Sequence, residues 1–118
     1  MGHLREHAIV VSGELYEHLD AAHKLATAIF PWVSPISPKA VNGNRAFFIP
    51  PDGSKEGWRE SIDGDNRRAA FKDAMRDAGN YSAWVEVMYG DDYGTDAVVV
   101  DDDRAAPSPI GTGEQNDG

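Results

Sequence analysis

The sequence contains no cysteine in its 118 residues. This absence excludes a disulfide framework, a thiolate nucleophile and every zinc site that uses cysteine, and it is typical of a reducing compartment. Long apolar runs are also missing. The richest apolar stretch, 25–33, contains Thr27 and Pro31 and is too short to span a bilayer. The apolar run at 8–11 is too short for a signal peptide, so we expect a cytoplasmic protein with no membrane partner.

Positive charge is scarce. Eleven basic residues stand against 20 acidic ones, which gives a net charge of −9, and residues 101–118 carry −4 of it. Binding to nucleic acid requires a basic patch, so we expect no nucleic-acid partner. The 41% apolar content is enough for one small core. We therefore expect a single domain over 1–100, followed by a disordered acidic tail over 101–118 that is rich in Pro, Gly, Ser and Asp.

The first half of the chain shows a strand, a helix and an extended segment. The apolar run within 6–12 predicts a strand. Apolar residues then recur at spacings of three and four over 14–30, which predicts an amphipathic helix that ends at Pro31. Residues 32–41 contain two prolines, so they form either an edge strand or an irregular extended segment.

The second half begins with Asn42-Gly43, a pair that favours a hairpin turn because both residues tolerate positive φ. The elements expected after it are a strand at 44–50, a helical region at 55–79 that Asp63-Gly64 interrupts, a strand at 81–89 and a last short strand at 95–100. The order β-α-β-β-α-β, with a possible fifth strand paired to the fourth, predicts an α+β fold. This is the ferredoxin-like split βαβ arrangement, an antiparallel sheet with two helices on one face.

Metal and catalytic signatures are weak. The pattern H-x-x-E-H occurs at 3–7, but a zinc site of this kind needs both histidines on one helix face, and here the pattern runs into a strand. The acidic stretches 63–66 and 90–96 lack the ligand spacing of an EF-hand. We expect no catalytic residue, no metal and no cofactor, and hence a protein that is not an enzyme.

Segment 52–68, DGSKEGWRESIDGDNRR, is the densest polar stretch. One interpretation is a solvated helix face with Trp58 in the core. The other is a recognition surface that grips an anionic or protein ligand. In that case we expect Trp58 and Ile62 to anchor the segment to the core, and Arg59, Arg67 and Arg68 to point outward. The candidate binding residues are Lys55, Arg59, Glu60, Asp63, Asp65, Arg67 and Arg68.

Several stretches resemble a family of small proteins encoded in tailed-phage and prophage genomes. They are HAIVV, VSPI, VNGNRAFFIPPDGSKEGW, GDNRRAAF and WVEVMYGDD, and together they cover most of residues 7–92. The resemblance brings no catalytic activity with it. It implies a phage accessory protein of the host-takeover or anti-defence type.

Two classes of function follow. The first is a non-enzymatic accessory protein that binds a host or phage protein and is itself a monomer or weak homodimer. The second is a small-ligand module that binds a nucleotide or similar anion through the basic residues of segment 52–68.

Overall fold

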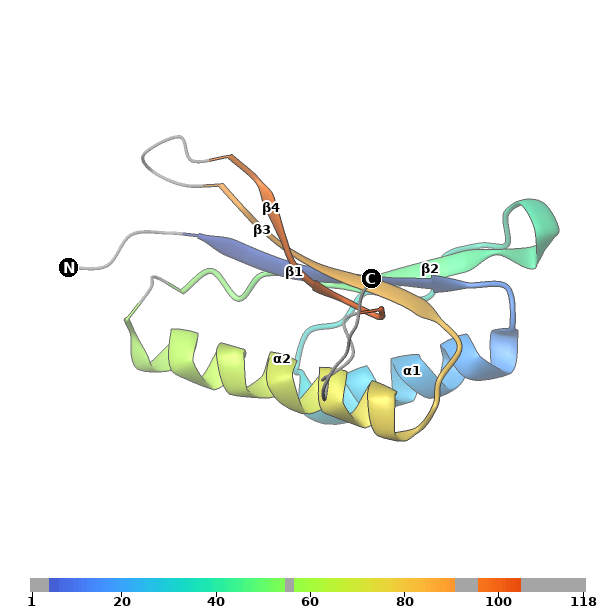
Figure 1. The fold of residues 1–118 in the computed structure, drawn as a ribbon, viewed down its shortest axis with the longest axis horizontal. Helices are drawn as coiled ribbons and strands as arrows, with labels where there is room; N and C mark the ends of the chain where they lie inside the picture. The colour runs from blue at the N-terminus through green and yellow to red at the C-terminus, as the bar shows by residue number, and fades with distance from the viewer. Residues whose placement is uncertain (1–4, 55–56, 91–95, 105–118) are drawn as a thin grey trace, which may run out of the picture.

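The computed structural model describes residues 5–54, 57–90 and 96–104. Within these ranges two helices cover one face of a four-stranded antiparallel sheet (Figure 1). The elements are β1 (Glu6–Gly13), α1 (Tyr16–Ile29), a 3-10 turn (Val41–Gly43), β2 (Arg45–Ile49), α2 (Arg59–Asp77), β3 (Ala83–Tyr89) and β4 (Val98–Asp102). The expected α+β class, an antiparallel sheet with both helices on one face, is confirmed.

The strands lie in the order β2-β1-β3-β4, and every neighbouring pair is antiparallel. Segment 33–40 extends along the side of β2 that faces away from β1. There the Ser34 N–H donates to Phe48 O and the Ser37 N–H donates to Ala46 O. The prolines in this segment lack N–H donors, so it is the irregular extended alternative and not a regular strand.

This extended segment completes the split βαβ pattern. It runs parallel to β1 with β2 between them, and β3 runs parallel to β2 with β1 between them. The Asn42-Gly43 turn is also confirmed, with φ of 59° and 76° at its two residues. β4 pairs with β3 and is the expected additional strand. It includes Asp101 and Asp102, so ordered structure continues past residue 100; the remainder of the expected tail, 105–118, lies outside the described residues.

Helix α2 differs from the expectation. It is one continuous helix, and Asp63-Gly64 does not interrupt it. Gly64 is buried, and a Cβ at this position would overlap the Asp52 carboxylate. The glycine therefore allows the helix and the chain at Asp52 to approach closely, which is one of the few reasons to keep glycine inside a helix.

The expected anchors of this helix are also wrong: Trp58 is 49% exposed and Ile62 is 56% exposed. The reason is the helical period. The buried stripe of α2 runs at spacings of three and four through Ser61, Gly64, Arg68, Phe71 and Met75. Ile62 lies one residue away from that stripe, and Trp58 precedes the helix as its N-cap residue.

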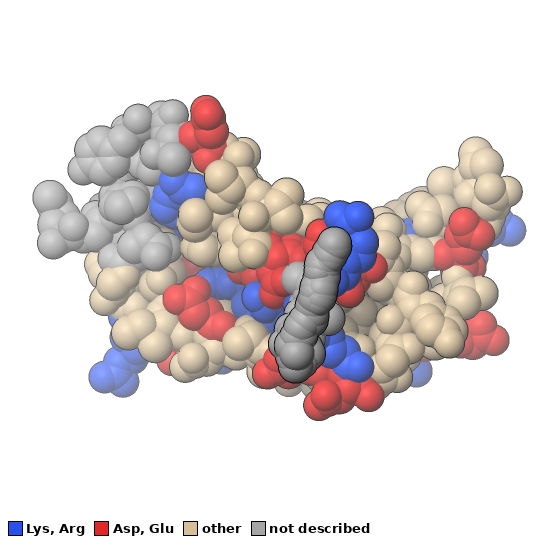
Figure 2. Space-filling model, viewed as in Figure 1, with Lys and Arg blue, Asp and Glu red and all other residues tan. Residues whose placement is uncertain are grey.

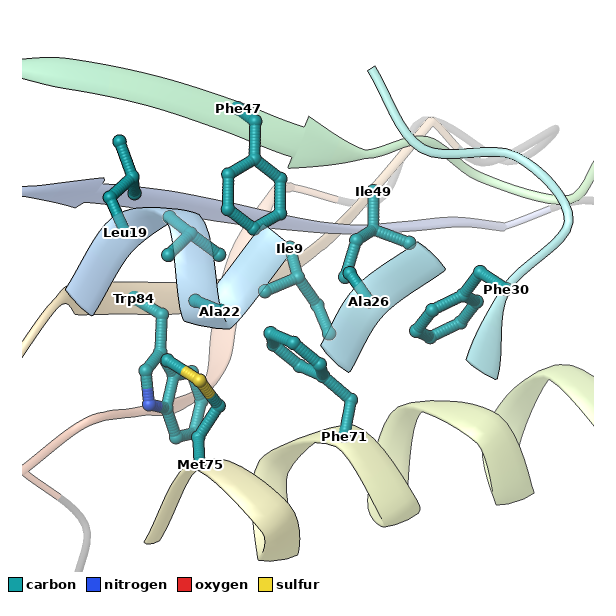
Figure 3. Close-up of a cluster of buried hydrophobic side chains, with 11 residues drawn as sticks. Ile9, Leu19, Ala22, Ala26, Phe30, Phe47, Ile49, Phe71, Met75 and Trp84 are labelled. Carbon is teal, nitrogen blue, oxygen red and sulfur yellow. The ribbon is translucent and has the colours of Figure 1, made fainter. Parts of the chain in front are cut away.

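The core between the sheet and the helices is small and apolar (Figure 3). In the close-up, Phe71 points from α2 toward Ile9 of the sheet, and Met75 lies beside Trp84 of β3. The buried cluster consists of Ile9, Val11, Leu19, Ala22, Ala26, Phe30, Phe47, Ile49, Phe71, Met75 and Trp84. Only Phe71 and Met75 come from α2, so apolar burial holds this 19-residue helix mainly at its C-terminal half.

Candidate functional site

The residues predicted to form a binding surface are dispersed by the fold. Arg59, Glu60 and Asp63 are exposed near the start of α2. Arg67 turns inward and donates to the carbonyl of Ile29, the last residue of α1. The other three candidates are placed as follows: Asp65 pairs with Arg68, Arg68 is buried, and Lys55 lies outside the described residues. The expectation that Arg67 and Arg68 point outward is therefore wrong.

Arg68 belongs to a layer of charged side chains between α2 and the sheet. We call this layer the ion cluster and define it as His7, Asp52, Asp65, Arg68, Lys72, Arg76, Glu86 and Asp101. Figure 2 shows acidic and basic side chains side by side in the middle of the molecule. The three strong bases of the ion cluster are Arg68, Lys72 and Arg76. They are spaced four residues apart along α2, so they form one row on the helix face.

Glu86 lies at the centre of the ion cluster, and its side chain is 5% exposed. Lys72 Nζ is 2.6 Å from Glu86 Oε1, and Arg68 Nε is 3.7 Å from Oε2. His7 Nδ1 approaches the same oxygen at 3.6 Å. A carboxylate this deeply buried is stable only when cations and donors surround it.

Asp101 of β4 extends the ion cluster toward the C-terminal end of α2. Lys72 Nζ is 3.1 Å from Asp101 Oδ2, and Arg76 donates to both oxygens of Asp101 and to Asp102 O. The Arg76 guanidinium also lies over the Trp84 ring, 5.0 Å from its centroid. At the other end, Arg68 Nη1 is 3.9 Å from Asp52 Oδ2.

The surroundings shift the pKa values of three members. Burial opposes ionisation of Glu86, but hydrogen bonds from His7 and Lys72 and the nearby positive charges outweigh it and lower the pKa of the carboxyl below 4.5. For Asp101, burial is likewise outweighed by Lys72 and Arg76, and the pKa falls below 3.8. Burial disfavours the charged form of Lys72, but Glu86 and Asp101 raise its pKa above 10.5.

These contacts make the ion cluster a structural element. Arg68, Lys72 and Arg76 each have a carboxylate partner within the protein, so none of the three presents a free charge to an anionic ligand. The cluster attaches α2 to β3 and β4 where the apolar core does not reach. Among the described residues, no group of three or more His, Asp or Glu side chains is arranged to hold a metal ion. His7 of the H-x-x-E-H pattern lies in β1, and His3 is outside the described residues.

The opposite face of the sheet is apolar and uncovered by the described chain. Phe48, Val10 and Val85 lie side by side across β2, β1 and β3, because Val10 is the registered partner of both neighbours. Val87 lies two residues after Val85 in β3, on the same face, and its registered partner in β4 is Val99. Val99 is 63% exposed. We call these five residues the sheet-face row.

A hollow of about 380 Å³ opens beside this row. Small residues, Ser12 and Ala83, leave the space, and Val10, Val85 and Val99 line it. Its rim is charged and consists of Asp102, Asp103 and Arg104. Arg104 pairs with Asp102, so Asp103 keeps the rim acidic.

Reasoning from sequence missed this surface, although a signal is present. Ile9-Val10-Val11, Phe47-Phe48 and Val98-Val99-Val100 put apolar residues at consecutive positions. Successive side chains of a strand point to opposite faces, so such runs place apolar groups on both faces of the sheet. With helices on only one face, one set is left exposed.

Comparison with protein-family models, curated proteins and solved structures found no match for the chain. Among the described residues no helix is both long and apolar enough to cross a membrane.

Proposed function

We propose that this chain is a non-enzymatic, phage-type accessory protein that binds a host or phage protein in the host cytoplasm. The observation that carries the proposal is the sheet-face row: a contiguous apolar surface on the one face that the helices leave free. Large contiguous apolar patches are uncommon on the surface of monomeric soluble domains, and they are typical of interaction sites.

The charge distribution favours a basic partner. The ion cluster contains three strong bases and four carboxylates, a net −1 with His7 neutral. Since the whole chain carries −9, a net −8 remains outside the cluster. Asp102 and Asp103, at the rim of the hollow beside the sheet-face row, lie outside the ion cluster and contribute to this net −8. Electrostatic complementarity then favours a partner that inserts an apolar side chain into the hollow and surrounds it with Lys or Arg.

The alternative, nucleotide binding through segment 52–68, has weaker support. Arg67 and Arg68 are bound to protein groups, which leaves Arg59 as the only exposed arginine of that segment among the described residues. A thermal-shift screen with nucleotides tests it, because any ligand that binds the folded state raises the melting temperature. A rise of several degrees would favour the alternative.

The proposal is tested by capture from host lysate with three forms of the protein. We expect wild type to retain a partner that Val10→Asp with Val99→Asp loses. Ala70→Asp, at an exposed position of α2 far from the row, serves as the matched control and should retain it. Capture that the paired sheet-face variant leaves unchanged would contradict the proposal. Sedimentation of each form at several concentrations shows whether the row instead binds a second copy.

A further inference from the structure

The loop between α2 and β3 presents the most exposed aromatic ring of the described residues. Tyr81 is 78% exposed. An aromatic ring so far in solvent contributes little to the core, yet this one is held in a defined position. The contacts that hold it come from α1, the helix 62 residues earlier in the chain.

His18 of α1 provides the support. Its imidazole stacks on the Tyr81 ring, with centroids 4.8 Å apart and planes 22° apart. The Tyr81 backbone N–H donates to His18 Nδ1 at 3.1 Å. Asn80 donates from its side chain to the His18 carbonyl at 2.8 Å and accepts the Ser82 N–H at 2.8 Å. Both neighbours of Tyr81 are thereby fixed, so the ring is ordered before any partner arrives, which reduces the entropy cost of binding.

Tyr81 lies between two open grooves. It lines one of about 500 Å³ together with Glu14, Leu15 and Asn44. It also lines one of about 590 Å³ together with Asp77 and Asp103. Each groove therefore combines the same aromatic ring with at least one carboxylate.

Neither groove offers an unpaired lysine or arginine of the described residues to an anionic ligand. Arg76 is the only lysine or arginine among the described residues that line either groove. Its guanidinium is bound to Asp101 and lies over Trp84. The net negative charge of the lining disfavours phosphate and nucleic acid and favours a cation.

We propose that Tyr81 and its two grooves bind an arginine side chain of a partner polypeptide. The guanidinium plane stacks on the exposed face of the ring, and Glu14 or Asp77 accepts its N–H groups. Arginine fits better than lysine, because its planar, weakly hydrated group both stacks and forms paired hydrogen bonds. The protein makes this contact twice internally: Arg45 lies 4.7 Å from the Tyr16 centroid, and Arg76 lies 5.0 Å from that of Trp84.

The test uses capped pentapeptides in which one arginine, lysine or citrulline stands between alanines, titrated into the ¹⁵N-labelled full chain. We expect the arginine peptide to shift the amide signals of Tyr81, Asn80 and Ser82 saturably. Citrulline has a planar ureido group of similar shape without the charge and should give no saturable shift. Lysine should bind more weakly than arginine.

Two variants of Tyr81 test whether the arginine side chain contacts its aromatic ring. Tyr81→Ala should weaken the arginine peptide about fivefold, the size of an exposed cation–π contact, whereas Tyr81→Phe should retain it. Equal binding of citrulline, unchanged binding by Tyr81→Ala, or saturable shifts at Tyr81 with an oligothymidine would each overturn the proposal. Val10→Asp, which alters the sheet-face row, should leave peptide binding unchanged. The proposed function and this site can therefore fail separately.

Discussion

Glu86→Gln removes the charge at the centre of the ion cluster while keeping the size of the side chain. Three cationic or protonatable groups approach that carboxylate: His7, Arg68 and Lys72. After the change, two strong bases lie next to a neutral amide in a site that is nearly closed to water. The free energy of unfolding should fall, because buried charges without a counter-charge are strongly disfavoured.

The expected loss in the free energy of unfolding depends on which carboxylate partners Arg68 and Lys72 keep after the substitution. Breaking a buried ion pair outright costs about 3–5 kcal/mol. Here Arg68 keeps Asp52 and Asp65, and Lys72 keeps Asp101, so the loss is partial. We expect about 2 kcal/mol, which for a domain of this size lowers the melting temperature by roughly 10 °C.

Urea unfolding followed by tryptophan fluorescence measures the change, since Trp84 is buried in the core. The matched control is Asp20→Asn, which removes the exposed pair of Asp20 with Lys24 on α1. That pair is worth less than about 0.5 kcal/mol. If Glu86→Gln costs no more than Asp20→Asn, then the ion cluster does not attach α2 to the sheet and the reasoning is refuted.

The same variant changes the dependence of stability on pH. Because the pKa values of Glu86 and Asp101 are lowered by folding, the unfolded state binds more protons in acid, and stability is lost as pH falls below 4.5. Lys72 has a raised pKa, so its contribution is present below pH 10.5 and is lost as pH rises through its folded value. Glu86→Gln should flatten the acid limb, and Asp101 should still contribute to its slope.

Two further substitutions test the packing of α2 and the core. Gly64→Ala should destabilise the protein by about 2 kcal/mol in urea unfolding, because the new methyl group overlaps the Asp52 carboxylate; Gly13→Ala meets only ordinary contacts and should be nearly neutral. Trp84→Ala should cost about 4 kcal/mol, whereas Trp58→Ala, at an exposed position, should cost less than about 1 kcal/mol. Equal losses within either pair would contradict the burial described for it.

Local sequence signals predicted much of the fold. The spacing of Leu19, Ala22 and Ala26 indicates one helix face, and the three residues are buried as that pattern requires. Asn42-Gly43 determines its own backbone conformation, because few other residues adopt positive φ without strain. These features depend on residues close together in the chain, and the sequence is sufficient for them.

The errors concern contacts between distant segments. Glycine stands at position 64 of a continuous helix because the Asp52 carboxylate, from outside the helix, occupies the space that a Cβ would need. Arg68 is buried because Glu86, 18 residues later, lies opposite it in β3. Neither partner is indicated by spacing along α2, so the local pattern favoured a break at Gly64 and an outward Arg68.

Charged side chains are buried beneath α2, and apolar side chains are exposed on the free face of the sheet. Both features have one origin, which is the distribution of apolar residues between the helix and the strands. Helix α2 brings few apolar residues to the interface, so charged side chains fill the layer where a core would continue. The sheet carries more apolar residues than one face can use, so the excess, including Val10 and Val99, remains on the free face. The charged row of α2, Arg68, Lys72 and Arg76, therefore belongs to the interior, and part of the apolar surface of the strands is accessible. If a partner binds the sheet face, it must cover apolar residues that no third layer of the described part of the chain buries.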